Sequence, residues 1–203
     1  GYDPYNGMVN CNLSSPTISN NRISNGSAHG IFLTGSNSLI DNNVINYMGN
    51  TAIRNTDSTL TISNNIISNI DYYGIQLMGG DNYTVSNNML NIIGSNGIYL
   101  SNGDNATISN NSLSNVSAGA AIYIYEGDSS IVSSNTIVNN SRYGEFTAIA
   151  INGSPYSEII NNEISFNEST GSYFYGIRFI NSGHSLINNN MITNNNSNLS
   201  SYL

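Results

Sequence analysis

The chain has 203 residues, of which 8% are charged, and four Arg without any Lys face twelve Asp and Glu to give a net charge of −8. So few cations cannot neutralise a row of phosphates or form a basic stripe for anionic lipid, which argues against nucleic-acid binding and membrane-surface attachment. No apolar run of about 20 residues predicts a membrane span, and the single cysteine, Cys11, cannot form an internal disulfide.

The first predicted strand is Gly7-Met8-Val9, within an opening half coil that we assign to residues 1–16. Met8 lies ten residues before Ile18, and the same spacing returns in the later repeats.

From residue 18 onward a six-residue pattern, aliphatic-x-Asn-Asn-x-aliphatic, organises the chain. Its eight copies lie at 18–23, 40–45, 62–67, 85–90, 108–113, 132–137, 159–164 and 187–192, and all sixteen aliphatic positions are Ile, Val or Leu. Successive copies start 22, 22, 23, 23, 24, 27 and 28 residues apart. Self-similarity at this period is typical of a β-solenoid coil and is too short for a propeller blade.

A second motif, Gly or Ala followed by Ile, lies between the copies of the first. It occurs at 30–31, 52–53, 74–75, 97–98, 121–122, 148–149 and 176–177, and most copies continue with alternating aliphatic residues, as in a half-buried strand. The sequence therefore predicts an all-β fold, a single-stranded parallel β-helix of about eight coils. We assign one domain to residues 1–203, with 193–203 as a short C-terminal tail.

The paired asparagines have an architectural explanation. In stacked coils the same position recurs about every 4.8 Å, so that identical amides form a continuous hydrogen-bonded ladder. The second Asn of the pair is present in all eight copies, whereas the first is replaced once, by Ser134. Asn also tolerates the left-handed backbone conformation that a sharp bend between strands requires.

The repeats TISNNRISN, TISNNIISN, TVSNNMLN, TISNNSLSN and LINNNMITN, within residues 17 to 194, resemble a known group. They are similar to right-handed parallel β-helices of the carbohydrate-binding and sugar-hydrolase type, close to NosD-like periplasmic proteins and adhesin-like surface proteins. The resemblance implies a right-handed β-helix. It does not select a function, because lyases, hydrolases, binding modules and spikes share this scaffold.

One corner of the predicted solenoid grows in the later coils. The separation from Ile137 to Ile149 is twelve residues and that from Ile164 to Ile177 is thirteen, against eight in the early coils. We expect loops on adjacent coils at this corner.

No catalytic constellation emerges from the sequence. His29-Gly30 and Arg178 are similar to elements of pectin hydrolases, but they lie six coils apart, roughly 29 Å at about 4.8 Å per coil. Two groups at that separation cannot act on one glycosidic bond. We therefore predict no catalytic residues and favour a protein that is not an enzyme.

An acidic column is the candidate metal site. Asp81, Asp104 and Asp128 each follow a Gly and lie six residues after a strand Ile, so they should stack about 4.8 Å apart. Oxygen ligands of this kind suit Ca²⁺, although Gly-Asp also suits a solvated turn. No cofactor is required by the sequence, and Ca²⁺ is the one that this column allows.

Aromatic residues form the candidate contact surface. Tyr99 and Tyr123 follow strand Ile residues on neighbouring coils and should form an outward strip, and the growing corner adds Tyr143, Phe146, Tyr173, Phe174 and Tyr175. Such rings stack on sugars or pack against a neighbouring protein. Alternatively, they are loop residues that cover the sheet edge.

The ends of the predicted solenoid have no cap, because the sequence predicts no amphipathic helix at either end. An uncapped solenoid end leaves backbone groups unpaired. We expect an extracellular or cell-surface structural or adhesive protein whose copies pair head to tail into a filament or surface layer. The alternatives are a piece of a longer solenoid and a polysaccharide-binding or polysaccharide-degrading β-helix protein.

Overall fold

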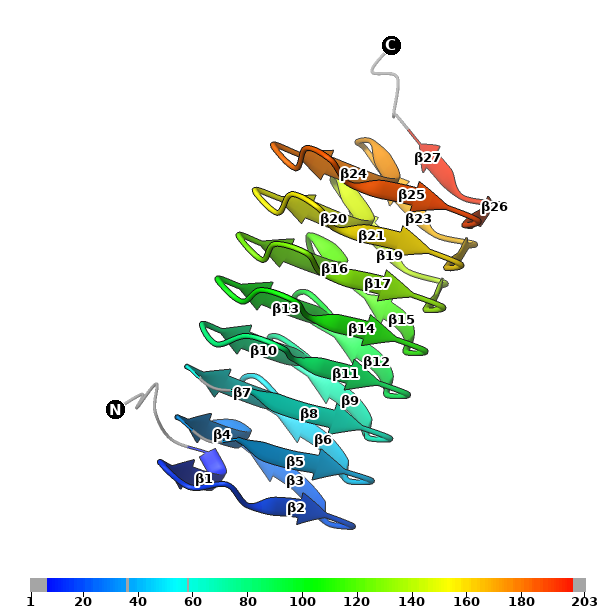
Figure 1. The fold of residues 1–203 in the computed structure, drawn as a ribbon. Coiled ribbons are helices and arrows are strands. Elements are labelled where there is room, and N and C mark those ends of the chain that lie inside the picture. The colour runs from blue at the N-terminus through cyan, green and yellow to red at the C-terminus, as the bar shows by residue number, and fades with distance from the viewer. Residues whose placement is uncertain (1–6, 36, 58, 199–203) are drawn as a thin grey trace.

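The computed structural model describes residues 7–35, 37–57 and 59–198. All regular structure in this part of the chain is β-strand, arranged as a parallel solenoid (Figure 1). No helix in the described ranges is long and apolar enough to cross a membrane. The predicted all-β parallel solenoid is confirmed.

Three principal sheets of eight strands each run along the solenoid, which matches the expected number of coils. Sheet A consists of β1 (Gly7–Asn12), β4 (His29–Thr34), β7 (Ile53–Thr56), β10 (Ile75–Met78), β13 (Ile98–Ser101), β16 (Ala120–Tyr125), β20 (Phe146–Asn152) and β24 (Phe174–Ile180). Sheet B consists of β2 (Thr17–Ser19), β5 (Ser38–Asp41), β8 (Leu60–Ser63), β11 (Thr84–Ser86), β14 (Thr107–Ser109), β17 (Ile131–Ser133), β21 (Glu158–Ile160) and β25 (Leu186–Asn188). Sheet C consists of β3 (Arg22–Gly26), β6 (Val44–Met48), β9 (Ile66–Ile70), β12 (Met89–Ile93), β15 (Ser112–Val116), β18 (Thr136–Val138), β22 (Glu163–Ser165) and β26 (Met191–Thr193).

At the growing corner, where we expected loops, the structure contains a fourth sheet. Sheet D consists of β19 (Ser141–Tyr143), β23 (Glu168–Thr170) and β27 (Asn196–Asn198), inserted between sheets C and A on the last three coils. The predicted C-terminal tail thus adds a strand, while residues 199–203 lie outside the described residues, as do residues 1–6 of the opening half coil.

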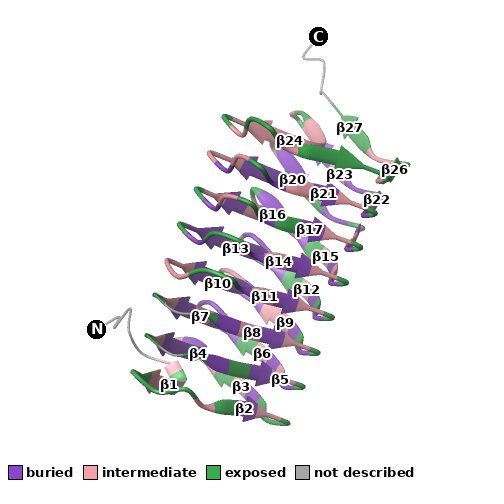
Figure 2. Cartoon of the chain, viewed as in Figure 1, coloured by how far each residue is buried: buried purple, intermediate pink, exposed green. Residues whose placement is uncertain are grey.

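Strand register follows the two sequence motifs. The strand isoleucines of the second motif pair with each other along sheet A, as Ile31 pairs with Ile53 and Ile53 with Ile75. The first motif spans the bend from sheet B to sheet C, and its aliphatic residues point inward. Figure 2 shows the resulting buried interior, which runs along the solenoid as far as the coil before the last.

The two asparagines of each pair have different tasks. The first takes a positive φ, between 52° and 58° in the eight copies including Ser134, and so makes the bend. The second is in the ladder, where each side-chain Nδ2 donates to Oδ1 of the next coil's Asn at 2.9–3.1 Å, from Asn21 to Asn190. A second, shorter ladder of Asn140, Asn167 and Asn195 holds the bend into sheet D.

Candidate functional site

The outer face of sheet A carries a row of rings that we call the tyrosine strip: Tyr73, Tyr99 and Tyr123. The parallel register places Tyr99 directly beside Tyr123, and their ring centroids are 5.6 Å apart. Tyr73, just before β10, stacks on Tyr99 at 5.2 Å. The strip therefore crosses three successive coils along the solenoid axis. Tyr99 and Tyr123 share one strand position, which recurs at every coil, whereas Tyr73 reaches Tyr99 from the corner before β10.

Two phenols at this face, Tyr73 and Tyr125, have raised pKa values. Burial raises the pKa of Tyr73 to about 12, and a hydrogen bond with Tyr72 adds to the shift. Next to the strip, a hydrogen bond to the Glu126 carboxylate raises the pKa of Tyr125. A general base that works near pH 7 needs a pKa near 7, so these hydroxyls are suited to hydrogen bonding and not to proton abstraction.

The strip ends at a cleft of about 240 Å³ on the same face, which we call the sheet-A cleft. Ala120, Thr147 and Ala150 are small and leave a hollow after the large Tyr123 ring. The complete lining is Asn96, Gly119, Ala120, Tyr123, Glu145, Thr147, Ala150, Arg178 and Ile180.

Arg178 forms the far wall of the cleft and is held by two neighbours. Its Nη1 donates to Glu145 Oε1 at 2.5 Å, and its guanidinium lies 4.7 Å from the ring centre of Tyr175. On the opposite side, Asn152 Nδ2 donates to the Tyr123 hydroxyl at 3.2 Å. Polar groups thus flank an aromatic surface, an arrangement typical of small-molecule and sugar sites.

The remaining predicted aromatic contacts are dispersed. Tyr143 is 81% exposed on sheet D, and Tyr173 is exposed just before β24. Tyr175 is half-buried beneath Arg178.

Phe146 was predicted to lie on the contact surface, but it is fully buried in the core. Phe174, on the next coil, is half-buried and packs against it, with ring centroids 6.2 Å apart. Sheet D lengthens the perimeter of these coils, and the wider interior needs large apolar side chains to keep it filled. Neither ring is part of an open contact surface.

The acidic column forms, and two of its carboxylates hydrogen-bond to the backbone of the next coil. Asp81 Oδ1 accepts from the backbone N–H of Asp104 at 2.9 Å, and Asp104 Oδ1 accepts from that of Asp128 at 2.8 Å. One oxygen of Asp81 and one of Asp104 therefore bond to the next coil. Across the described ranges, no three His, Cys, Asp or Glu side chains form a group able to hold a metal.

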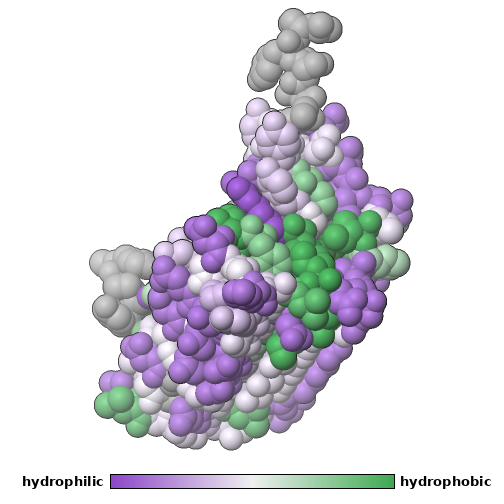
Figure 3. Space-filling view, turned by 45° about the horizontal axis from the view of Figure 1, so that its top comes forward, coloured by the Kyte–Doolittle hydropathy of each residue, from purple (hydrophilic) through white to green (hydrophobic). Residues whose placement is uncertain are grey.

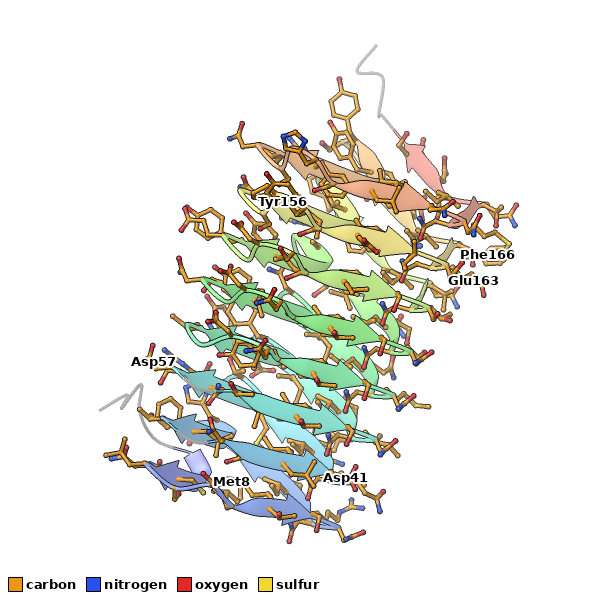
Figure 4. The ribbon with its side chains drawn as sticks, viewed as in Figure 1. Met8, Asp41, Asp57, Tyr156, Glu163 and Phe166 are labelled. Carbon is orange, nitrogen blue, oxygen red and sulfur yellow. The ribbon has the colours of Figure 1, made fainter. Side chains whose placement is uncertain are left out.

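The column ends at Asp128, because the next residue in it is Pro155, which has no N–H. Burial raises the pKa of Asp128, and the negative charge of Asp104 raises it further. On the next two coils the turn displays Tyr156 stacked on His184, with ring centroids 5.2 Å apart. Figure 4 shows Tyr156 and Asp57 at this edge of the solenoid and Phe166 at another.

His29 and Arg178 remain far apart, on β4 and β24, as expected. His29 is buried, and its Nε2 lies 3.5 Å from Nη1 of Arg54. Arg54 also lies over the ring of Phe32.

Tyr73 and Glu145 are members of the site that the sequence reasoning missed. Tyr73 is two residues before the strand Ile75, a position that holds Asn96 and Ala120 on the next two coils, so the repeat gives no aromatic signal for it. Glu145 follows β19 at the variable corner, where no repeat gives its position.

A larger groove of about 680 Å³ follows the corner between sheets C and A on the early coils. Tyr47 and Ile92 protrude beside it, both with positive φ, at a corner position where Asn is usual. Its other lining residues are Met48, Gly49, Asn69, Ile70, Asp71, Ile93, Gly94, Asn115 and Ser117. Tyr47 is its single ring, so the groove lacks the stacked platform of sheet A.

Comparison with known proteins agrees with the architecture. A family model described as a right-handed β-helix region matches residues 7–147, more than half of the chain. Among solved structures, the A-module of the mannuronan C-5 epimerase AlgE4 from Azotobacter vinelandii is similar, with a TM-score of 0.53 and 14% identity. The match covers 86% of this chain and 62% of that module, so the chain spans less than two thirds of the module's length. No curated protein matches the sequence at a significant level.

Proposed function

The chain belongs to the right-handed β-helix family, and on this scaffold we propose that it is a polysaccharide-binding protein whose binding surface is the outer face of sheet A. The observation that carries the proposal is the tyrosine strip, which leads without interruption into the sheet-A cleft. Exposed rings in a row stack on the apolar faces of sugars, while neighbouring amides and hydroxyls satisfy sugar hydroxyl groups. The epimerase with the same fold is named for a polysaccharide, which supports this class of ligand.

The proposal is for binding and not for turnover. Tyrosine rings and an arginine paired with a carboxylate provide contacts, but they do not provide the pair of oppositely tuned acid and base that sugar hydrolysis uses. A polysaccharide ligand also fits the location that we propose, outside the cell or at its surface.

Affinity electrophoresis in gels that contain soluble polysaccharides tests the proposal. We expect the wild-type protein to be retarded by at least one polymer. Tyr123→Ala should weaken that binding about tenfold, because one stacking ring contributes ~0.5–1.5 kcal/mol beyond its buried area and about 1.4 kcal/mol is a factor of ten.

Tyr47→Asn is the matched control, since it removes an exposed tyrosine from the corner groove and installs the residue that other coils carry there. It should leave the retardation unchanged. Equal weakening by both variants would mean that sheet A is not the binding face.

End-to-end association is a second candidate, supported by the exposed C-terminal coil. Ile187 and Ile192 are 53% and 46% exposed, whereas the core residues one coil earlier, Ile159 and Ile164, are fully buried. Figure 3 shows apolar surface gathered at this end. The ladder is also directional: backbone and side-chain N–H groups donate toward the C-terminal end, and the next acceptor for Asn190 would be Asn21 Oδ1 of a second copy.

Sedimentation at several protein concentrations tests this candidate. Head-to-tail pairing predicts species larger than 21.8 kDa that Ile192→Asp abolishes. Leu186→Asp, an exposed residue of β25 whose neighbour across the sheet is the outward Glu158, should leave them intact. A wild-type protein that stays monomeric at every concentration would rule out the candidate.

A further inference from the structure

The charge of the binding face points to the chemical class of the ligand. The whole chain has four cationic side chains against twelve acidic ones. On the outer face of sheet A the cations are Arg54 on β7 and Arg178 on β24, one before the tyrosine strip and one after it. The rings between them are uncharged.

Both arginines already have partners within the protein. Arg178 pairs with Glu145 at 2.5 Å and lies over Tyr175. Arg54 lies beside His29 and over the ring of Phe32. An incoming carboxylate or sulfate would have to displace Glu145 to gain the two parallel hydrogen bonds that arginine offers to planar anions.

Negative charge borders the strip on its other sides. Glu126 hydrogen-bonds Tyr125, whose ring contacts Tyr123, and Asp104 and Asp128 follow the ends of the same strands. With a net charge of −8, the long-range field of the protein also repels polyanions.

The groups that the face does offer suit hydroxyls. Tyrosine hydroxyls donate and accept hydrogen bonds, and Asn96, Thr147 and Asn152 add amide and hydroxyl groups around the sheet-A cleft. These groups follow one another along the solenoid axis. From Tyr73 to Arg178 the chain advances four coils, about 19 Å at ~4.8 Å per coil.

We infer that the ligand of this face is an uncharged polysaccharide that lies along the solenoid axis across the tyrosine strip, and that the Glu145–Arg178 pair excludes polyuronates from the sheet-A cleft. This inference rests on the proposed function. It separates the chain from the similar epimerase module, whose named substrate, mannuronan, is a polyuronate.

Affinity electrophoresis against neutral and anionic polymers tests the inference. The neutral probes are hydroxyethylcellulose, galactomannan and xyloglucan. The anionic probes are carboxymethylcellulose, polymannuronate and polygalacturonate. Each gel is run at about 0.1 M and about 1 M NaCl, which shortens the Debye length from ~10 Å to ~3 Å.

The expected result is retardation by a neutral polymer that is unchanged by salt and weakened by Tyr123→Ala. Preferential binding to an anionic polymer that salt weakens would overturn the inference and leave the proposed function standing. If no polymer retards the wild-type protein more than Tyr123→Ala, the proposed function fails and the inference fails with it.

Glu145→Gln gives a second, independent readout. The variant removes one negative charge and releases the Arg178 guanidinium, so its affinity for polymannuronate should rise severalfold, and the gain should vanish at high salt. Glu163→Gln, which removes the same charge from sheet C, is the matched control and should give no gain. Equal gains in both variants would show that net charge, and not the Glu145–Arg178 pair, excludes the polyanion.

Discussion

Removal of a central rung should reveal how much of the fold depends on the asparagine ladder. Asn111 is buried at the middle of the solenoid. Its Nδ2 donates to Val85 O, Ser109 O and Asn135 Oδ1 at 2.9–3.0 Å. Its Oδ1 accepts from both the backbone N–H and Nδ2 of Asn88 at 2.9 and 3.0 Å. Asn111→Ala deletes all of these bonds and leaves the backbone in place.

The loss of stability follows from the polar groups that the substitution leaves without a hydrogen-bond partner. The buried N–H of Asn88 loses its acceptor, which costs ~1–3 kcal/mol, and the two bonds to backbone carbonyls contribute ~0.5–1.5 kcal/mol each. We therefore expect Asn111→Ala to lower the free energy of unfolding by about 4 kcal/mol. Asn21 begins the ladder at an exposed position, with one neighbouring rung, so Asn21→Ala should cost about 1 kcal/mol or less.

Equilibrium urea unfolding followed by far-UV circular dichroism measures both variants. Solenoids can lose their all-or-none behaviour, so amide hydrogen exchange adds a local readout: the Asn88 amide should exchange faster in Asn111→Ala, and amides on distant coils should be unaffected. If Asn111→Ala costs no more than Asn21→Ala, the ladder does not hold the coils together and the argument fails.

Four further substitutions test other parts of the structure. Ile92→Asn should raise the free energy of unfolding by about 1 kcal/mol in urea titrations. The reason is that a half-exposed β-branched residue with φ of 57° is replaced by one that tolerates this conformation. If the free energy of unfolding does not rise, the backbone at Ile92 is not strained. Phe146→Ala should cost ~3–5 kcal/mol and Tyr143→Ala less than about 0.5 kcal/mol, and similar losses would contradict the burial of Phe146. Asp128→Asn should melt at a higher temperature than wild type at pH 7: the folded-state pKa of Asp128 is raised, so its penalty exists above that pKa and vanishes as the pH falls below the ordinary value of 3.8. A melting difference that grows on acidification would reverse this sign.

The fold could be predicted from the sequence because, in a solenoid, residues that contact each other in space recur at a regular spacing in the sequence. Residues that share a motif position, such as Ile40 and Ile62, become neighbours across a sheet, so one repeat predicts the sheets, the bends and the ladder together. Sheet D was not predicted, because only the last three coils contain it and its strands are three residues long. The burial of Phe146 follows from that sheet, and for the same reason it was not visible in the repeat.

The candidate site was only half predictable, because the repeat constrains inward positions more than outward ones. The inward position of the second motif is Ile in all seven copies, while the outward position beside it holds Arg54, Gln76, Tyr99, Tyr123 or Ala150 on successive coils. The scaffold therefore fixes where an outward residue lies and leaves its chemistry open.

Function on such a scaffold resides in departures from the repeat. The tyrosine strip exists because three successive coils place rings on one face of sheet A, and the sheet-A cleft exists because the next coil places small residues there. Glu145, which holds Arg178, comes from the corner where sheet D lengthens the coil. The irregular corner thus supplies the charged pair that borders the cleft, and the regular strands supply the surface on which we place a polysaccharide.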